Sequence, residues 1–373
     1  MYLKKLSLLQ FRNYEEATID CSERINCFTG LNGSGKTNLL DAIHYLSLCK
    51  SFLNPVDSQN VRFAQPFFVV QGLFVNTNGP EDGKIGSEDN ILCSVKRGQR
   101  KVFKRNNKEY ERLSDHIGLF PLVAVSPADS VLVTGGSEER RRFMDTVISQ
   151  FNRQYLEQLI SYNRVLSQRN ALLKQMSQGQ VADDGTLEVL DLQLEQYGAP
   201  VFIARKAFIR ELLPFFSGYY SQLSNGAEEV ELVYESKLNG KSLGQLLKES
   251  LQRDRVLGHT SVGVHKDDLD FTISGHSLKR SGSQGQQKTF LIALKLAEYI
   301  FLDRASGKKP LLLLDDVHDK LDAERVERLM DIVCGKNFGQ LFITDTGAGR
   351  MHELFEGKGL PYKMFRVEEG KIS

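Results

Sequence analysis

The stretch Gly30-Leu-Asn-Gly-Ser-Gly-Lys36-Thr37 decides the fold of this chain. It matches the complete phosphate-loop pattern, in which glycines at both ends of the loop are followed by a lysine and a hydroxyl residue. A short apolar stretch over residues 24–29 precedes the loop. Apolar residues with helical spacing follow it, at Leu39, Leu40, Ile43, Leu46 and Leu48. We therefore predict that a strand leads into the loop and that the loop begins a helix, as a phosphate cradle requires.

The phosphate loop predicts that the chain binds ATP together with Mg²⁺. Backbone N–H groups and the positive end of the helix would hold the phosphates, and Lys36 would add a charge beside the outer ones. The Thr37 hydroxyl would ligate the magnesium ion. A chance glycine turn before a helix is the alternative reading. We expect the ATP-binding residues here to be Gly30, Leu31, Asn32, Gly33, Ser34, Gly35, Lys36, Thr37 and Asn38.

A second element of the same site stands near the other end of the chain, at Pro310-Leu-Leu-Leu-Leu-Asp315-Asp316. Its apolar run is too continuous for an exposed strand, and two carboxylates follow where the run stops. Ligands of open α/β sheets collect at such carboxyl ends. We expect Asp315 to bind Mg²⁺ and Asp316 to position the attacking water, although two acids there could also simply cap the next helix. The predicted catalytic residues are Lys36, Asp315 and Asp316.

The segment Ser283-Gln-Gly285-Gln286-Gln287 lies shortly before this second element. Such clusters are ordinary loop chemistry, but this one opens a helix predicted over residues 286–304. Its hydroxyl and N–H groups could bind the γ-phosphate of an ATP held on a second subunit. We therefore add Ser283, Gly285 and Gln286 to the ATP-binding residues. We also expect residues 319–322 to lie at the contact of a two-fold homodimer that encloses two ATP molecules.

Composition sets the broad class of the protein. The chain has 373 residues, of which 41% are hydrophobic and 25% are charged, and this is typical of a globular protein with two lobes. The net charge of +1 means that a nucleic-acid partner would need a local basic patch. The five cysteines show no paired short spacing, which argues against a zinc site or a disulfide framework. Without a signal peptide or a long apolar run, we expect a cytoplasmic protein that does not interact with membranes.

Periodicity predicts two lobes. The first, residues 1–125 with 305–373, carries the ATP site, and the second, residues 126–304, is mainly helical. Long helices are expected over residues 138–173 and 186–224, the latter with breaks at Gly198-Ala-Pro200 and near Pro214. Loops are expected over residues 76–90 and 178–185. Strands are expected over residues 3–11, 24–29, 67–75, 91–95, 230–234, 269–273, 311–314 and 340–344.

Two groups of basic residues are candidates for binding DNA phosphates. The first comprises Lys96, Arg97, Arg100, Lys101, Lys104, Arg105 and Lys108, and the second begins at Arg140 and Arg141. The alternative for any charge run is a solvated face, and the arginines could instead pair with Glu138, Glu139 or Asp145. Phosphate contacts carry no sequence information, so we expect a preference for DNA structure rather than for sequence.

Further segments closely resemble the RecF family over nearly the whole chain. They are Phe11-Arg12-Asn13-Tyr14 and residues 30–43, 126–129, 135–145, 162–170 and 263–268. RecF proteins are bacterial recombination-repair ATPases whose head domain is related to that of SMC proteins. The resemblance implies an α/β fold, a P-loop ABC-type ATPase head with a second, mainly α-helical lobe. In this family the string at residues 263–268, with His265, is a structural part of the helical lobe rather than a metal site.

The resemblance also implies a function. RecF-like proteins form an ATP-driven dimer that clamps DNA, either a duplex or a junction of single and double strands. With RecO and RecR, such a protein promotes the loading of RecA at single-stranded gaps. Slow ATP hydrolysis then resets the clamp, so the chain would be a weak, DNA-stimulated ATPase.

Several residues depart from related patterns. Ser126 stands where SMC heads carry a magnesium-sensing glutamine, and Val264 and Lys266 replace the proline and arginine usual in RecF proteins. Asp316 is one methylene shorter than the glutamate of most transport ATPases, which predicts slow turnover. Residues 344–346 occupy the position where transporters carry a histidine, and they add the charge of Asp345.

Two other functions remain as alternatives. An ATPase subunit of a membrane transporter shares the loop, the signature and the acids, but it usually lacks the Phe11-Arg-Asn-Tyr14 segment and carries the switch histidine. A nucleotide-switched scaffold that does not bind DNA is the second alternative, and the intact Lys36, Thr37 and Asp315 oppose a vestigial site.

Overall fold

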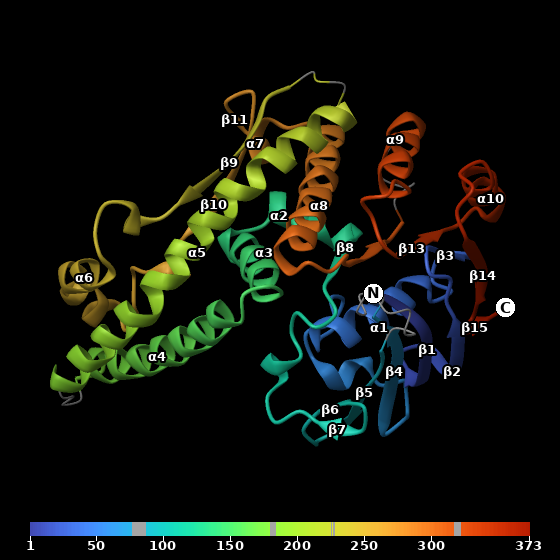
Figure 1. Ribbon diagram of the computed structural model, residues 1–373. Helices are drawn as coiled ribbons and strands as arrows, with labels where there is room; N and C mark the ends of the chain where they lie inside the picture. The colour runs from blue at the N-terminus through green and yellow to red at the C-terminus, as the bar shows by residue number, and fades with distance from the viewer. Residues whose placement is uncertain (77–86, 180–183, 225, 227, 317–321) are drawn as a thin grey trace. The chain divides into compact units, whose positions relative to one another are not determined.

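The computed structural model describes residues 1–76, 87–179, 184–224, 226, 228–316 and 322–373. The chain forms two compact units, each assembled from segments that are far apart in sequence (Figure 1). Unit 1 comprises Met1–Asp129, Tyr219–Asn225 and Gln284–Ser373. Unit 2 comprises Ser130–Gly218 and Gly226–Ser283. In the described part of the chain, no helix combines the length and the apolar character that crossing a bilayer requires.

The first sheet of unit 1 has the strand order β15-β14-β3-β13-β12-β8. Its strands are β15 (Lys371–Ile372), β14 (Tyr362–Glu368), β3 (Ile25–Thr29), β13 (Leu341–Asp345), β12 (Leu311–Leu314) and β8 (Leu122–Val125). The strands from β14 to β8 pair in parallel. Strands β3, β12 and β13 are buried along their whole length, which explains their continuous apolar sequences. Their carboxyl ends meet at one edge of the sheet, where the segments that follow them gather.

The second sheet of unit 1 is antiparallel, in the order β2-β1-β4-β5-β6-β7. Helix α1 (Lys36–Leu48) contacts strands of both sheets. Its side chains are therefore buried at every position from Leu39 to Leu48, and it is apolar on more than one face. Strand β2 was not predicted from the sequence. The strands are β1 (Tyr2–Phe11), β2 (Tyr14–Asp20), β4 (Phe67–Val75), β5 (Glu88–Lys96), β6 (Val102–Arg105) and β7 (Lys108–Glu109).

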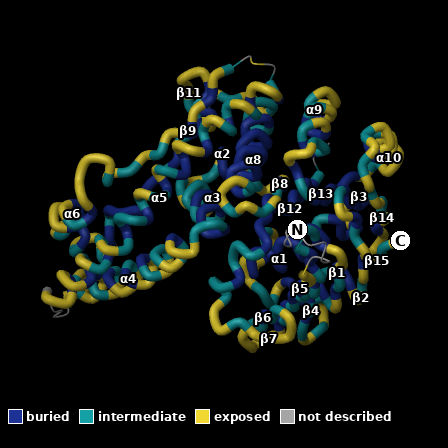
Figure 2. Tube along the Cα trace, in the orientation of Figure 1, coloured by how far each residue is buried: buried dark blue, intermediate teal, exposed yellow. Residues whose placement is uncertain are grey.

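Three further helices belong to unit 1. Helix α8 (Gln284–Ser306) packs beside β8 and is buried from Thr289 to Leu302 (Figure 2). The second lobe predicted from the sequence, residues 126–304, included this helix. The structure instead groups α8 with unit 1, because its buried residues pack against the parallel sheet. Helices α9 (Ala323–Val333) and α10 (Ala348–Glu356) follow β12 and β13 along the chain.

Unit 2 is mainly helical, as predicted. Its main helices are α3 (Ser137–Ser149), α4 (Arg153–Ser177), α5 (Asp184–Ser224, of which the last residues belong to unit 1) and α6 (Leu243–Leu257). The single helix predicted over residues 138–173 is wrong, because a turn separates α3 from α4. The Asn152 side chain ends that turn by accepting a hydrogen bond from the N–H of Tyr155 and capping α4.

Helix α5 continues through both of its prolines, so the breaks predicted at Pro200 and Pro214 are wrong. A proline inside a helix costs about 3 kcal/mol because it removes a hydrogen bond and crowds the preceding turn. Residues on both sides of the two prolines are fully buried, among them Leu194, Val201 and Leu212. Their packing offsets the local cost and keeps the helix continuous.

A small antiparallel sheet completes unit 2, in the order β11-β10-β9. Its strands are β9 (Val230–Glu235), β10 (Asp268–Ile273) and β11 (His276–Ser277), and the short helices α2 (Val131–Thr134) and α7 (Leu278–Ser281) lie near it. Buried arginines connect the long helices of this unit. Arg169 of α4 pairs with Asp254 of α6 at 2.8 Å, and Arg205 of α5 pairs with Asp145 of α3 at 2.8 Å.

Parts of some predicted elements lie outside the described residues. These are residues 77–86 of the loop predicted at 76–90, residues 180–183 of the loop predicted at 178–185, and residues 319–321 of the predicted dimer-contact segment. Asp322, the last residue of that segment, caps α9 by accepting a hydrogen bond from the N–H of Arg325.

Candidate functional site

The phosphate loop lies between β3 and α1, as the sequence predicts. Gly35 precedes α1 with a φ of 116°, a conformation that favours glycine. A Cβ atom at this position would lie 2.4 Å from Asn13 Nδ2, so no larger side chain fits without displacing Asn13. The loop therefore has the conformation and the close contacts that its glycines indicate.

The segment between β1 and β2 supports the loop from the side. The Asn13 side-chain amide donates to the Ser34 carbonyl at 2.9 Å, and the Tyr14 hydroxyl donates to the Gly35 carbonyl at 3.0 Å. Arg12 pairs with Asp41 of α1 at 2.8 Å. No site role was predicted for these residues from the sequence. The only signal was the Phe11-Arg-Asn-Tyr14 motif, whose contacts with the loop appear once the chain is folded.

Lys36 lies within the loop and is only 4% exposed. Its ammonium group donates to the carbonyls of Gly30 and Leu31, at 2.8 and 2.9 Å. The Gly30 N–H in turn donates to the Asp345 carbonyl at the end of β13, at 3.3 Å. The lysine is thus fixed beside the N–H groups that open α1, where the outer phosphates of a nucleotide would be bound.

The two sequence elements of the site, the phosphate loop and the acids after β12, meet at Asp315. The Thr37 hydroxyl, at the start of α1, donates to Asp315 Oδ1 at 3.0 Å. Hydroxyl and carboxylate oxygens are hard ligands that suit Mg²⁺, which usually completes its shell with waters and substrate phosphates. The two residues therefore fit the predicted role of holding magnesium. Among the described residues, no group of three or more His, Cys, Asp or Glu side chains could bind a metal by itself.

Thr344 connects the Asp315 carboxylate with the backbone of Asp316, a contact that was not predicted from the sequence. Its hydroxyl donates to Asp315 Oδ1 at 2.7 Å and accepts from the Asp316 N–H at 2.9 Å. Asp316 has a φ of 47°, a left-handed conformation that is uncommon outside glycine. The Asp316 N–H bond to Thr344 helps to hold this conformation. The nearby Asp345 carboxylate accepts from the N–H of Gly347 in its own turn.

We expect Thr344→Val to lower ATP turnover at least tenfold while the affinity for ATP stays within about threefold. The change keeps the side-chain shape but removes the hydrogen bond to the buried Asp315 carboxylate and the bond to the part-buried Asp316 N–H, at a cost of about 1–3 kcal/mol. Phosphate release and binding of a fluorescent nucleotide would measure the two effects. Thr18→Val, on the exposed strand β2, is the matched control. Unchanged turnover in Thr344→Val would contradict this role.

Residues 283–287, called the signature segment from here on, open α8 as predicted, since the helix begins at Gln284. Ser283 and Gln284 are exposed, and Gly285 and Gln286 are partly exposed. The first N–H groups of a helix have no partners within the helix, and here they lie beside an exposed serine hydroxyl. Such a turn is suited to binding an anion that a second molecule presents.

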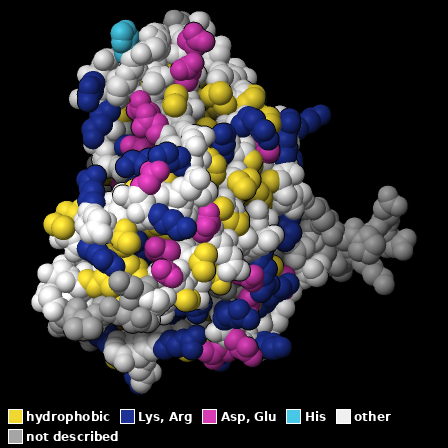
Figure 3. Space-filling view, turned by 90° about the vertical axis from the view of Figure 1, so that its left-hand side faces the viewer, with side chains coloured by type: hydrophobic (Ala, Val, Ile, Leu, Met, Phe, Trp, Pro, Cys, Tyr) yellow, Lys and Arg dark blue, Asp and Glu magenta, His cyan; other side chains and the backbone are white. Residues whose placement is uncertain are grey.

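The basic residues predicted to bind DNA fall into two classes. Lys96, Arg97, Arg100 and Lys108 are exposed on or beside β5, β6 and β7, and Lys104 is partly exposed. Lys101 and Arg105 have internal partners, because Lys101 pairs with Asp57 at 2.9 Å and Arg105 pairs with Asp89 at 2.7 Å. On the face of the molecule that Figure 3 shows, Lys and Arg side chains are interspersed with Asp and Glu. On that face, the mixed charges do not form a broad basic surface.

The structure gives Arg140 and Arg141 a different role from the predicted DNA contact. Arg140 makes two hydrogen bonds to Asp268, at 2.8 and 2.9 Å, and Arg141 donates to the Asp267 carbonyl at 2.6 Å. The Arg140 side chain is only 11% exposed, and burial lowers the pKa of Arg141. Both arginines therefore anchor α3 to the start of β10. These contacts favour a structural role for both arginines, and their binding to DNA stays a prediction.

The string at residues 263–268 is also structural. His265 contacts the Tyr162 hydroxyl at 2.7 Å through Nδ1 and the Thr260 carbonyl at 3.1 Å through Nε2. Burial lowers the pKa of His265 to about 4, so its ring is neutral at pH 7. Val264 and Lys266, which depart from the family pattern, form a short helical turn, and the Val264 carbonyl accepts from Arg205 at 2.7 Å.

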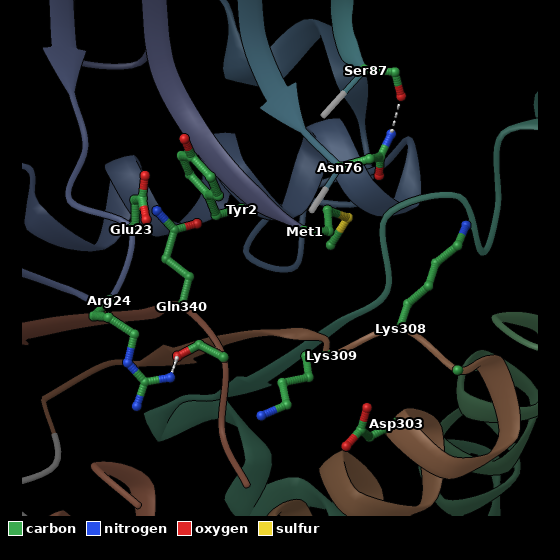
Figure 4. A pocket seen from close by; sticks show the side chains of 12 residues that line it. Met1, Tyr2, Glu23, Arg24, Asn76, Ser87, Asp303, Lys308, Lys309 and Gln340 are labelled. Carbon is green, nitrogen blue, oxygen red and sulfur yellow. Dashed lines mark hydrogen bonds between the residues drawn. The ribbon is translucent and has the colours of Figure 1, made fainter. Parts of the chain in front are cut away.

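A cavity of about 680 Å³ lies at the opposite edge of the parallel sheet (Figure 4). Its lining includes residues that precede the parallel strands: Arg24 before β3, Lys309 before β12 and Gln340 before β13. The phosphate loop and the two acids follow the other ends of those strands. The cavity is therefore separate from the candidate ATP site.

Comparison with known proteins identifies close relatives. The family model described as the RecF/RecN/SMC N terminal domain matches residues 2–372. The DNA replication and repair protein RecF of Bacteroides fragilis (strain YCH46) is 50% identical over 373 residues, which cover 100% of this chain and 98% of that protein.

Solved structures agree with these sequence matches. A structure of the recombination mediator protein RecF with ATP, in the RecFOR pathway, matches with a TM-score of 0.88 and 31% identity, over 100% of this chain and 97% of that one. The Smc head domain of Pyrococcus furiosus, bound to the C-terminal domain of ScpA, matches with a TM-score of 0.59 and 17% identity, over 100% and 95% of the two chains. The second match shows the fold alone. Together they confirm the predicted fold class, a P-loop ABC-type ATPase head with a second, mainly helical lobe.

Proposed function

This chain belongs to the RecF family, and from that premise we propose that it is an ATP-dependent DNA-binding protein of replication and recombinational repair. The observation that carries the proposal is the contact of the Thr37 hydroxyl with Asp315, at 3.0 Å, between residues from opposite ends of the chain. That contact places the phosphate loop beside the acids that a nucleotide-hydrolysing site needs.

In the proposed reaction, the N–H groups of the loop and Lys36 orient the triphosphate and stabilise the charge that develops on its outer phosphate. Thr37 and Asp315 would hold Mg²⁺, which when bound neutralises phosphate charge. Asp316 would orient the attacking water. Because its carboxylate stands on a short side chain, on a backbone whose N–H donates to Thr344, we propose slow turnover, as expected of a weak, DNA-stimulated ATPase.

Each ATP would be enclosed between two subunits. The loop of one subunit would bind the triphosphate, and Ser283 with the first N–H groups of α8 from the other would contact the γ-phosphate. The exposure of Ser283 and Gln284 supports this arrangement, because a buried turn could not reach a second subunit. ATP would thus join two copies in a two-fold dimer, and hydrolysis would separate them.

DNA would be bound while the dimer is closed, with the exposed residues Lys96, Arg97, Arg100 and Lys108 as candidate phosphate ligands. ATP hydrolysis would then determine how long the protein stays bound to DNA, either a duplex or a junction. The DNA itself would not be altered. By analogy with the RecFOR pathway, we propose RecR and RecO as partners. The proposed outcome is the loading of RecA at gaps. The proposed location is the cytoplasm.

The salt dependence of DNA binding tests this surface. We expect ATP-dependent binding to duplex DNA whose log affinity falls linearly with log salt concentration, and Arg100→Ala with Lys108→Ala should lower the slope by about 0.9 for each lost contact. Lys237→Ala with Lys248→Ala removes the same charge from exposed positions in unit 2 and serves as the control. Equal slopes for the two double variants would exclude this surface.

ATP turnover measured with and without duplex DNA tests the function as a whole. We expect DNA to stimulate turnover, together with DNA affinity that is higher with ATP than with ADP. A transporter subunit or a scaffold that does not bind DNA would show neither effect, and that result would overturn the proposed function.

A further inference from the structure

Three ionisable side chains meet inside unit 1, outside the residues assigned to the ATP site. Lys295 and Glu298 lie about one turn apart on α8, and Asp129 lies in the short helical turn that follows β8 (Pro127–Ser130). The Lys295 Nζ atom is 3.2 Å from Glu298 Oε2 and 3.6 Å from Asp129 Oδ1. Lys295 is 8% exposed and Glu298 is 3% exposed.

Packing alone does not account for these charges. Replacing a buried ion pair by apolar residues often leaves stability unchanged or raises it. The residues around Lys295 on α8 are mostly buried and apolar, so an apolar side chain would suit this position at least as well. Burial by itself would lower the pKa of Lys295, but Asp129 and Glu298 outweigh it and raise that pKa. Lys295 therefore stays charged at pH 7, and the retained charge indicates a role beyond packing.

Asp129 connects this lysine to the acidic end of the parallel sheet. Its Oδ2 atom accepts a hydrogen bond from the Ser126 N–H at 2.6 Å. Ser126 directly follows Val125, whose carbonyl accepts from the Asp315 N–H at 2.8 Å. A short series of contacts thus leads from Lys295 to the backbone of Asp315, whose carboxylate is proposed to hold Mg²⁺.

Lys295 also lies close to the helix that the phosphate loop opens. His44 of α1 is buried, and its Nδ1 atom contacts the Lys50 carbonyl at 2.8 Å. Burial lowers the pKa of His44 to about 4, and the charge of Lys295 acts in the same direction. The His44 ring is therefore neutral at pH 7 and adds no charge beside Lys295. The charged partners of Lys295 are Asp129, in the turn after β8, and Glu298, on α8 itself.

We propose that Lys295 is a positioning residue for ATP-driven dimerisation. By pairing with Asp129, it holds α8 in a fixed register with Ser126 and Asp315, so that the signature segment at the start of α8 is presented to a second subunit. That segment lies roughly 15 Å upstream along the helix axis. The inference rests on the proposed function, and Lys295 acts through Asp129 rather than on ATP itself.

The test compares nucleotide binding with dimerisation in the full chain. We expect Lys295→Met to bind a fluorescent ATP analogue within about twofold of wild type. The same variant should need at least a tenfold higher concentration to form the ATP-dependent dimer in sedimentation velocity. Lys295→Arg keeps the charge and should restore dimerisation. Asp129→Asn should also weaken dimerisation. The asparagine oxygen can still accept the hydrogen bond from the Ser126 N–H, but the side chain no longer carries the negative charge that pairs with Lys295.

Arg304→Met removes a positive charge from the exposed end of the same helix and is the matched control. Wild-type dimerisation in Lys295→Met or Asp129→Asn would overturn the proposal. So would a parallel loss of ATP binding and thermal stability in both variants, because that result would show a purely structural role. If wild type itself stays monomeric with ATP, the proposed function fails and this inference fails with it. If wild type dimerises and the variants do too, only this inference fails.

Discussion

Ser283→Arg should abolish ATP-driven dimerisation while ATP still binds to each monomer. In the proposed dimer, Ser283 lies against the γ-phosphate side of the partner's site, in a closed interface. The arginine is far larger than serine, and its charge would be buried without an oppositely charged partner, which costs about 3–5 kcal/mol. That cost corresponds to a dimer dissociation constant raised by a factor of about 100 to 4,000. The phosphate loop of the same subunit is unchanged in this variant, so it should keep its affinity for ATP.

Sedimentation velocity with a non-hydrolysable ATP analogue would measure the dimer, and a fluorescent nucleotide would measure binding to the monomer. Gln252→Arg, at an exposed position of α6, adds the same charge outside the signature segment and is the control. We expect wild type and Gln252→Arg to dimerise alike. If Ser283→Arg sedimented with them, the signature segment would have no part in an interface.

Lys36→Arg should lower ATP turnover at least 100-fold while nucleotide binding stays largely intact. The Lys36 ammonium occupies a buried position fixed by the carbonyls of Gly30 and Leu31. A guanidinium is planar and larger, so it keeps the positive charge but cannot place a single donor at the same point. Charge therefore still attracts the triphosphate, whereas the alignment needed in the transition state is lost, by about 2.7 kcal/mol or more.

Phosphate release under saturating ATP would give the turnover, and equilibrium binding of a fluorescent analogue would give the affinity. Lys50→Arg, at the exposed position just beyond α1, is the matched control and should behave as wild type. Substantial turnover in Lys36→Arg would mean that the loop lysine has no role in the chemistry. A loss of ATP affinity as large as the loss of turnover would mean that Lys36 acts in binding ATP rather than specifically in the transition state.

The sequence predicts the parts of the site that depend on local pattern. The glycine loop, the buried strand before Asp315 and the start of α8 each have a signature within one short segment, and the structure has all three. The support of the loop by Asn13 and Tyr14 could not be predicted in this way, because it depends on β1 and β2 packing beside α1. Thr344 was likewise missed, since its contact with Asp315 joins two neighbouring strands of the sheet.

Tertiary packing also explains where the structure departs from the expectations drawn from local sequence. Pro200 and Pro214 are local signals for helix breaks, but buried residues on both sides hold α5 together. Arg140 and Arg141 form part of a charge run that suggests a DNA surface, yet their partners, Asp268 and the Asp267 carbonyl, lie more than a hundred residues away. Helix α8 was assigned to the helical lobe by its sequence order, whereas its buried face packs with the parallel sheet.

Amide hydrogen exchange can show whether each ATP site is completed by a second subunit. The first turn of α8 begins at the exposed residues Ser283 and Gln284, so an interface that covers it should slow the exchange of its N–H groups. With saturating ATP analogue, we predict that residues 30–38 become protected at every protein concentration, while residues 283–287 become protected only at concentrations where the dimer forms. Protection of both segments in the monomer, or exposure of residues 283–287 in the ATP-bound dimer, would contradict the account.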